Sequence, residues 1–322
     1  MRDAINNFAK QFEYDPVVEN SGMLKHYAGF IVAGMGGSHL AADLLRVWRP
    51  ELDIVVQSDY GFPADLKPEW LEHMLFIASS YSGNTEEAID AYHEAGRKGM
   101  ARAVIAVGGA LLAAAKKDGV PYVQLPDTGI QPRSALGFSF KALLKIIGED
   151  AALSEISKRA STLRPSEYEA QGRELAQKLN GCVPVVYSSA RNAAIAYNWK
   201  IKFNETGKIP AFYNVFPELN HNEMTGFDVK DATKDLSRNF FFIFLKDAED
   251  DARILKRMET TERLYRDRGL KVNVVEMRGA DVFEKMFSSL LVADWAAYYT
   301  AEAYGLESEQ VPMAEEFKKL IA

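Results

Sequence analysis

Short apolar runs alternate along the chain with longer segments whose apolar residues recur at helical spacing. The apolar runs predict strands at residues 29–33, 53–57, 74–78, 103–107, 122–125, 183–187, 240–245 and 272–276. Strands that alternate with helices favour parallel sheets covered by helices on both faces. We therefore expect an α/β fold with two doubly wound parallel sheets, each in a three-layer α/β/α arrangement.

The chain divides into two similar halves. Its 322 residues are enough for two domains of roughly 150 residues each. A polar, helix-forming connector covers residues 149–180, so we place the domains at 1–150 and 151–322. The apolar run at 74–78 is echoed at 240–244, which indicates a diverged repeat. The apolar and aromatic helix predicted at 282–303 is a candidate dimer surface.

Two loops at predicted strand ends carry the first chemical signal. The glycine loop, residues 34–38 (GMGGS), follows one strand, and the serine loop, residues 79–85 (SSYSGNT), follows another. Glycines let a ligand approach backbone N–H groups, and the N-terminus of the following helix favours an anion. The glycine loop alone is equally typical of a tight strand-to-helix turn. The hydroxyls of the serine loop favour a phosphate held between both loops.

Competing phosphate motifs fail on spacing. The chain has no Gly-x-x-x-x-Gly-Lys-Ser/Thr sequence, and His39 occupies the place of the third glycine in a dinucleotide fingerprint. Asp59 lies near the end of the next strand, where a ribose-binding acid would be found. This position leaves a nucleotide-dependent dehydrogenase as an alternative.

Composition and net charge limit the possible partners and the location of the protein. The formal net charge is −7, which disfavours nucleic acid. Cys182 is the single cysteine, so there is no internal disulfide, and its place in an apolar run favours a buried, inert thiol. We see no signal peptide and no apolar run of the roughly 20 residues that a membrane span needs. These features predict a cytoplasmic protein without a membrane partner.

Polar residues in the second half form a second candidate site. Taken alone, Glu205 is typical of a solvated helix end, and His221 of a loop histidine. Glu218 and Glu223 suggest a metal site around His221, but a single local histidine makes that site a poor one, and we expect no metal. Four acidic residues at 247–251 take the place of the serine loop in this half. They would repel phosphate, so we expect one phosphate site per chain and a solvated helix start here.

Six motifs together resemble the bifunctional phosphoglucose/phosphomannose isomerase family of the sugar isomerase (SIS) superfamily. In chain order they are Gly34-x-Gly36-Gly37-Ser38, Asp59-Tyr60-x-x-Pro63, residues 80–85 (SYSGNT), Pro132-Arg133, Phe203-Asn204-Glu205 and residues 217–223 (PELNHNE). The resemblance spans nearly the whole chain. The serine loop is shared by many phosphosugar-binding SIS proteins, whereas the stretch at 217–223 is much narrower. The resemblance implies two flavodoxin-like SIS domains.

The resemblance also implies residue roles. The residues that would hold the substrate phosphate are Gly36, Gly37, Ser38, Ser80, Ser82 and Thr85. Glu205 matches the proton-transfer base, and Arg133 the group that stabilises the intermediate. His221 matches a histidine that assists ring opening across a dimer interface. Lys318 fits a C-terminal active-site lysine best, although a displaced proline leaves the adjacent Lys319 as an alternative. A homodimer is expected.

The residue types suit an aldose–ketose isomerisation. Moving a proton between C1 and C2 through a cis-enediolate needs a carboxylate base, a cation for the developing oxyanion and an acid/base for ring opening. It needs no cofactor. We expect glucose 6-phosphate, fructose 6-phosphate and mannose 6-phosphate as substrates. A non-catalytic phosphosugar-binding regulator and an isomerase of another sugar phosphate are the alternatives.

Overall fold

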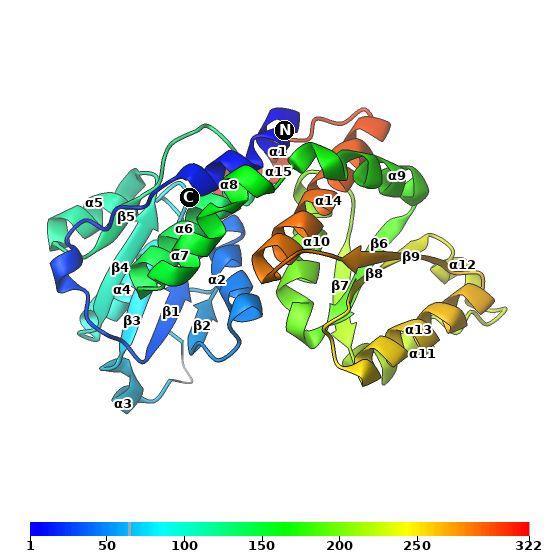
Figure 1. The fold of residues 1–322 in the computed structure, drawn as a ribbon, viewed down its shortest axis with the longest axis horizontal. Helices are drawn as coiled ribbons and strands as arrows, with labels where there is room; N and C mark the ends of the chain where they lie inside the picture. Colours follow the sequence, from blue (N-terminus) through cyan, green and yellow to red (C-terminus); the bar gives the residue numbers. More distant parts are fainter. Residues whose placement is uncertain (64–65, 322) are drawn as a thin grey trace. The chain divides into compact units, whose positions relative to one another are not determined.

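The computed structural model describes residues 1–63 and 66–321 (Figure 1). It contains two compact units. The N-terminal unit comprises residues 6–163, and the C-terminal unit comprises residues 1–5 with the chain from residue 164 onward. Each unit is built on its own parallel sheet with helices on both faces. The predicted α/β class with two doubly wound parallel sheets is therefore confirmed.

The N-terminal sheet has five parallel strands. They are β1 (Gly29–Ala33), β2 (Ile54–Gln57), β3 (Met74–Ser79), β4 (Ala101–Ala106) and β5 (Tyr122–Gln124). Their spatial order is β2-β1-β3-β4-β5, the flavodoxin-like arrangement. The order reverses between β1 and β3, which pair directly with Ala33 opposite Ala78. Ligands of such sheets bind beyond the carboxyl ends of the strands at this reversal.

Helices cover both faces of this sheet. The α-helices are α2 (Gly37–Trp48), α3 (Pro68–Leu71), α4 (Glu86–Arg97), α5 (Gly109–Asp118), α6 (Leu136–Ile147), α7 (Asp150–Ser157) and α8 (Arg159–Thr162). Short 3₁₀ turns are η1 (Phe8–Glu13), η2 (Ser21–Met23) and η3 (Pro132–Ser134). Helices α4 and α5 bury Tyr92 and Leu111 against Ile31 and Phe76 on one face. Helices α2 and α6 pack together and cover the other face.

The C-terminal sheet has four parallel strands, one more than the apolar runs predict in this half. They are β6 (Val183–Ser189), β7 (Phe212–Phe216), β8 (Phe240–Asp247) and β9 (Lys271–Met277). Their order, β7-β6-β8-β9, matches that of β2-β1-β3-β4, which supports the repeat. The unexpected strand is β7. It lies at the sheet edge, and its first two residues, Phe212 and Tyr213, are exposed.

The helices of the C-terminal unit also form two layers. The α-helices are α1 (Arg2–Asn6), α9 (Glu169–Leu179), α10 (Ala193–Glu205), α11 (Glu223–Gly226), α12 (Lys234–Ser237), α13 (Ala252–Asp267), α14 (Val282–Ala303) and α15 (Pro312–Ile321). The 3₁₀ turns are η4 (Pro165–Tyr168), η5 (Ala190–Asn192) and η6 (Glu218–Asn220). Helix α13 packs Met258 and Tyr265 against Phe242 and Phe244 of β8. On the other face, α10 packs on β6 and on α14.

Helix α14 does not present the apolar face expected of a dimer surface. It packs between α9 and α10 inside the C-terminal unit, with Leu291, Trp295 and Ala296 fully buried. Gly172 of α9 allows this close packing, because a Cβ there would lie 2.3 Å from the Cβ of Trp295. No helix in the described part of the chain is both long and apolar enough to span a membrane.

Candidate active site

The glycine loop and the serine loop lie side by side at the carboxyl ends of β1 and β3. The hydroxyl of Ser79 donates to the backbone oxygen of Ser38 at 2.8 Å, and the backbone N–H of Tyr81 donates to the Ser38 hydroxyl at 3.0 Å. A Cβ on Gly34 would lie 2.6 Å from the Ser79 oxygen, so glycine is required for this contact. The two loops therefore form one surface in the N-terminal unit.

The predicted phosphate residues differ in exposure. Ser38 and Ser80 are buried, Thr85 is half-buried and Ser82 is exposed. The hydroxyls of Ser80 and Thr85 bond each other at 2.8 Å, and Ser80 also accepts from the Gly83 N–H at 3.1 Å. The Ser82 hydroxyl accepts from the Asn84 N–H at 3.2 Å. Ser80 thus shapes the loop from inside, whereas Ser82 faces solvent.

Helix α2 provides the more favourable N-terminus for an anion. Gly36, at its N-cap, has a positive φ of 50° and open space beside it. Such space lets a ligand reach the backbone N–H groups of the first turn. The first turn of α4 carries two carboxylates, Glu86 and Glu87, which would repel a phosphate. Anion binding at this edge therefore depends on α2 and on the loop N–H groups.

Arg133 lies against the start of the same helix. It belongs to η3 and is only 3% exposed. A Cβ on Gly37 would lie 2.8 Å from the Arg133 backbone nitrogen, so the two segments are in backbone contact. Gln11 fixes the segment by donating to the Ser134 oxygen at 2.6 Å. The structure thus brings Arg133 together with Gly36, Gly37 and Ser38.

Glu205 is the last residue of α10 and is half-buried. The preceding turns anchor it firmly. Lys202 forms a buried ion pair with Asp294 of α14 at 2.6 Å, and Trp199 donates to the Ser289 hydroxyl at 3.0 Å. The Lys208 ammonium donates to the Glu205 backbone oxygen at 2.6 Å. These contacts fix the end of α10 from which the Glu205 side chain projects.

His221 is exposed and lies just beyond the carboxyl end of β7, between η6 and α11. Helix α10 leads from the carboxyl end of β6 back to the start of β7, and β6 and β7 are parallel. Glu205 is therefore at the amino edge of the sheet and His221 at the carboxyl edge. The 13 residues of α10 span about 20 Å. Within one chain, the structure does not bring Glu205 and His221 together.

Lys318 is on α15, where it pairs with Glu315 at 2.6 Å. No described residue of α15 is buried, and Phe317 next to Lys318 is 60% exposed. The structure places neither Lys318 nor Lys319 beside the other predicted site residues of the C-terminal unit.

The acidic segment at 247–251 is only partly the solvated helix start that the sequence predicts, because Glu249 and Asp251, the N-cap of α13, are exposed but the other two acidic residues are buried. Asp247 and Asp250 are 2% and 7% exposed rather than solvated. Asp247 accepts from the Lys285 ammonium of α14 at 2.8 Å, and Asp250 accepts from the Ser189 hydroxyl at 2.6 Å. Burial acts to raise the pKa of Asp247, but the Lys285 ammonium holds it below its usual value. This ion pair lies at the carboxyl end of β8, the position that the serine loop takes at the end of β3 in the other sheet.

Glu223, two residues after His221, makes contacts that the sequence did not reveal. Both carboxylate oxygens of Glu223 accept hydrogen bonds, one from the Tyr187 hydroxyl and one from the Asn214 amide. The sequence suggested Glu223 only as a metal ligand. The signal that the sequence did offer was Tyr187, a residue with a polar hydroxyl at the end of the apolar run at 183–187.

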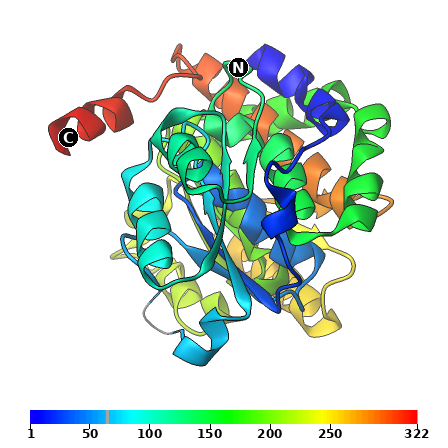
Figure 2. The ribbon, with the colours of Figure 1, turned by 90° about the vertical axis from the view of Figure 1, so that its left-hand side faces the viewer.

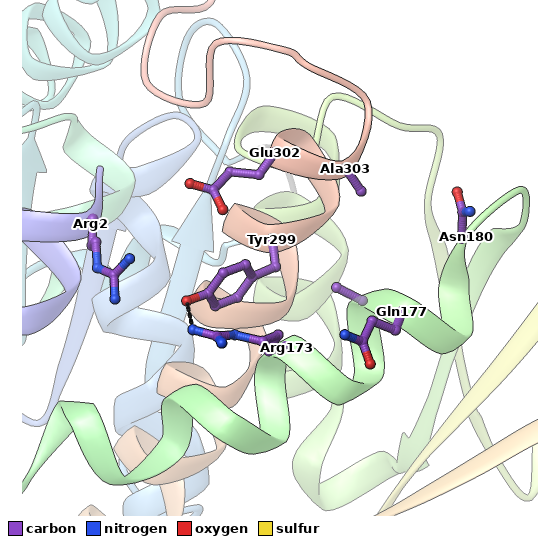
Figure 3. Close-up of a pocket in the computed structure, with 8 residues that line it drawn as sticks. Arg2, Arg173, Gln177, Asn180, Tyr299, Glu302 and Ala303 are labelled. Carbon is purple, nitrogen blue, oxygen red and sulfur yellow. Dashed lines mark hydrogen bonds between the residues drawn. The ribbon is translucent and has the colours of Figure 1, made fainter.

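A separate hollow lies between α9 and the end of α14 (Figure 3). The two arginines that line it are bonded to neighbouring side chains. Arg173 donates to the Tyr299 hydroxyl at 2.6 Å and to Glu169 at 2.9 Å, and Arg2 also pairs with Glu169 at 2.7 Å. None of the predicted site residues lines this hollow. The candidate site residues therefore remain those predicted from the sequence, none of which belongs to this hollow.

Comparison with known proteins gives a consistent result. A family model described as "Bacterial phospho-glucose isomerase C-terminal SIS domain" matches residues 168–321. The chain is 34% identical over 309 residues to a bifunctional phosphoglucose/phosphomannose isomerase of Caldicellulosiruptor bescii, covering 91% of this chain and 89% of that protein. It is 35% identical over 306 residues to the protein of the same name from Thermoplasma volcanium, covering 92% of each.

Solved structures agree on the fold. The C-terminal domain of glucosamine-fructose-6-phosphate aminotransferase from Francisella tularensis superposes with a TM-score of 0.67 at 13% identity, covering 96% of this chain and 95% of that one. At this identity the likeness concerns the fold alone. The sequence relatives, which match nearly end to end, identify the branch: this chain belongs to the bifunctional phosphoglucose/phosphomannose isomerase family.

Proposed function

We propose that the protein is an aldose–ketose isomerase that interconverts glucose 6-phosphate and fructose 6-phosphate, and mannose 6-phosphate and fructose 6-phosphate. Family membership over nearly the whole chain carries this proposal. Both aldoses give the same enediolate once the proton at C2 is removed, so one base serves both reactions. No external oxidant or reductant takes part, because C1 and C2 exchange oxidation states within one molecule.

We assign the phosphate to the joined glycine and serine loops. Backbone N–H groups at the start of α2 would bind its oxygens, helped by the exposed Ser82 hydroxyl. Arg133, whose backbone touches Gly37, would provide the positive charge that stabilises the enediolate oxygens. Support for this assignment comes from the contact between the loops and η3.

We assign proton transfer to Glu205. In the direction of the ketose, its carboxylate takes the proton from C2, and the resulting carboxylic acid returns it to C1, with the enediolate between the two steps. His221, with Lys318, would move the proton between the ring oxygen and the C1 hydroxyl as the ring opens. Support for these roles comes from the residue types and from their matches to the family motifs.

We also propose that the active unit is a homodimer. Glu205 and His221 of one chain are at opposite edges of one sheet, and α10, which runs from one edge to the other, is about 20 Å long. Two side chains that act on one sugar must be much closer than this. A His221 donated by a second chain resolves the conflict. A cytoplasmic location stays a prediction from the sequence.

A direct assay tests the proposal. Purified protein is incubated with fructose 6-phosphate in D2O, and the products are followed by ¹³C and ¹H NMR without coupling enzymes. We expect glucose 6-phosphate and mannose 6-phosphate, each carrying deuterium at C2 where the enediolate exchanged with solvent. If phosphosugar binds but neither aldose forms, the protein is a phosphosugar-binding regulator. If a different sugar phosphate forms, it is another isomerase.

A further inference from the structure

Glu223 ties the segment that carries His221 to the middle of the C-terminal sheet. The Tyr187 hydroxyl donates to Oε1 of Glu223, and the Asn214 amide donates to Oε2. Tyr187 and Asn214 are paired residues on β6 and β7, so both donors come from one register position of two neighbouring strands. Hydrogen bonds to a carboxylate are roughly twice as strong as those between neutral groups. Glu223 is therefore fixed at two points.

The stronger anchor is Tyr187. Its side chain is fully buried, and its ring contacts Phe216 at 5.9 Å and Phe244 at 5.4 Å between centroids. Burial raises the pKa of the Tyr187 phenol, so the hydroxyl keeps its proton and remains a donor. A side chain packed in this way cannot move without disturbing the core. The position of Glu223 is thus set by the core of the sheet.

The other side of His221 is fixed to α13. The Asn220 amide donates to the hydroxyl of Thr261 at 2.9 Å, and Thr261 is buried. The Asn220 side-chain oxygen accepts from Arg257 at 3.4 Å. Leu219 is fully buried against the same layer. His221 thus has anchored residues on both sides while it remains exposed.

We propose that Glu223, held by Tyr187 and Asn214, is a positioning residue that aims the His221 imidazole. This inference rests on the proposed function, in which His221 opens the sugar ring. Both oxygens of Glu223 are engaged by side chains of the sheet, so Glu223 acts through the backbone that it shares with His221. A misplacement of about 1 Å in a catalytic group can cost ~100-fold in rate, which makes such anchoring necessary.

Tyr187→Phe is the most selective test, because it removes the hydroxyl and keeps the ring. Tyr265→Phe is the matched control. Its hydroxyl lies 3.5 Å from that of Tyr187 in the same aromatic cluster, but Glu223 has both of its contacts without it. We expect Tyr187→Phe to lower kcat by about tenfold or more with little change in KM, and Tyr265→Phe to stay within about twofold of wild type. Wild-type kcat for Tyr187→Phe overturns the proposal.

A double-mutant cycle separates positioning from general damage. If Tyr187 acts through His221, Tyr187→Phe costs no further activity in a His221→Gln background. If the activity losses of Tyr187→Phe and His221→Gln multiply in the double variant instead, Tyr187 does not act through His221 and the proposal fails. Asn214→Ala, which removes the second donor from the edge strand, is measured in the same cycle. It decides the question if Tyr187→Phe does not fold.

An NMR readout keeps the inference testable even if the isomerase assay fails. The chain has five histidines, so the His221 ring proton can be assigned by its loss in His221→Gln. We expect the chemical shift of this proton to move in Tyr187→Phe and Asn214→Ala and to stay in Tyr265→Phe. If the His221 signal is unchanged in both Tyr187→Phe and Asn214→Ala, the positioning role is overturned, regardless of which substrate the enzyme converts.

Discussion

Glu205 and His221 are in the same unit of the chain yet at opposite edges of its sheet, with the length of α10 between them. If each active site takes Glu205 from one chain and His221 from another, two inactive variants can complement each other. Glu205→Gln and His221→Gln are expressed separately, mixed under conditions that exchange subunits, and assayed. Each mixed dimer contains one intact site, so a statistical mixture should regain about a quarter of wild-type activity. A mixture as inactive as its components contradicts a shared site.

Glu205→Gln tests the base itself. The variant keeps the shape of the side chain but cannot accept a proton from C2. We expect kcat to fall by ~10²–10⁴-fold, the usual contribution of general acid–base catalysis. Fructose 6-phosphate should still raise the melting temperature, because the glycine and serine loops, to which we assign the phosphate, belong to the other unit. Glu174→Gln, on the exposed side of α9, is the control and should keep full activity. Near-normal turnover of Glu205→Gln removes Glu205 from this role.

Gly37→Ala tests the contact between α2 and η3. The added Cβ would lie 2.8 Å from backbone atoms of both Pro132 and Arg133, which cannot turn away as a flexible side chain can. Overpacking of this kind costs about 1–3 kcal/mol. We expect a lower melting temperature and a higher KM, since Arg133 and the helix N-terminus both shift. Gly22→Ala, whose Cβ would meet nothing within 4 Å, should change neither. An unaffected Gly37→Ala would show that the two segments are not closely packed.

The sequence predicted most strands because parallel strands buried on both faces are continuous apolar runs. Strand β7 escaped this rule, since Asn214 interrupts it and Tyr213 is exposed at the sheet edge. The glycine and serine loops could be placed at the same edge of one sheet because alternation with helices implies parallel strands, whose carboxyl ends share one edge. The contact of Arg133 with Gly37 could not be predicted from the sequence, because nearly a hundred residues separate them along the chain.

Buried charged residues were the other feature that could not be predicted from the sequence. Acidic residues close together in sequence usually face water, so residues 247–251 were read as a solvated helix start. Lys285, 38 residues after Asp247, forms ion pairs with Asp247 and Glu249 in the folded protein. The hydrogen-bond partners of Glu223 could not be predicted for a similar reason, because Tyr187 and Asn214 come from two separate strands. These pairings depend on the register between neighbouring strands. The apolar pattern of a single strand does not define that register.

The buried Asp250 provides a test by pH. Burial raises its pKa above the usual value, and its Oδ2 has no hydrogen-bond partner among the described residues. The folded state therefore binds the Asp250 proton more tightly than the unfolded state, and this contribution to stability is lost as pH rises through the raised pKa. Asp250→Asn removes the titration and keeps an acceptor for Ser189. Relative to wild type, its free energy of unfolding in urea should rise as pH increases above about 4, the usual pKa of an aspartate.

The adjacent Asp251 makes the control unusually sharp, because its shift has the opposite sign. The side chain and backbone N–H of Arg253 lower the pKa of Asp251 to about 2, so its contribution to stability is present at neutral pH and lost in acid. Asn is also an effective N-cap, so Asp251→Asn should leave α13 intact. Relative to wild type, Asp251→Asn should lose stability as pH rises from about 2 to 5, while Asp250→Asn gains it. Parallel curves for the two variants would mean that Asp250 is ionised like a surface carboxylate and that the buried cluster is wrongly described.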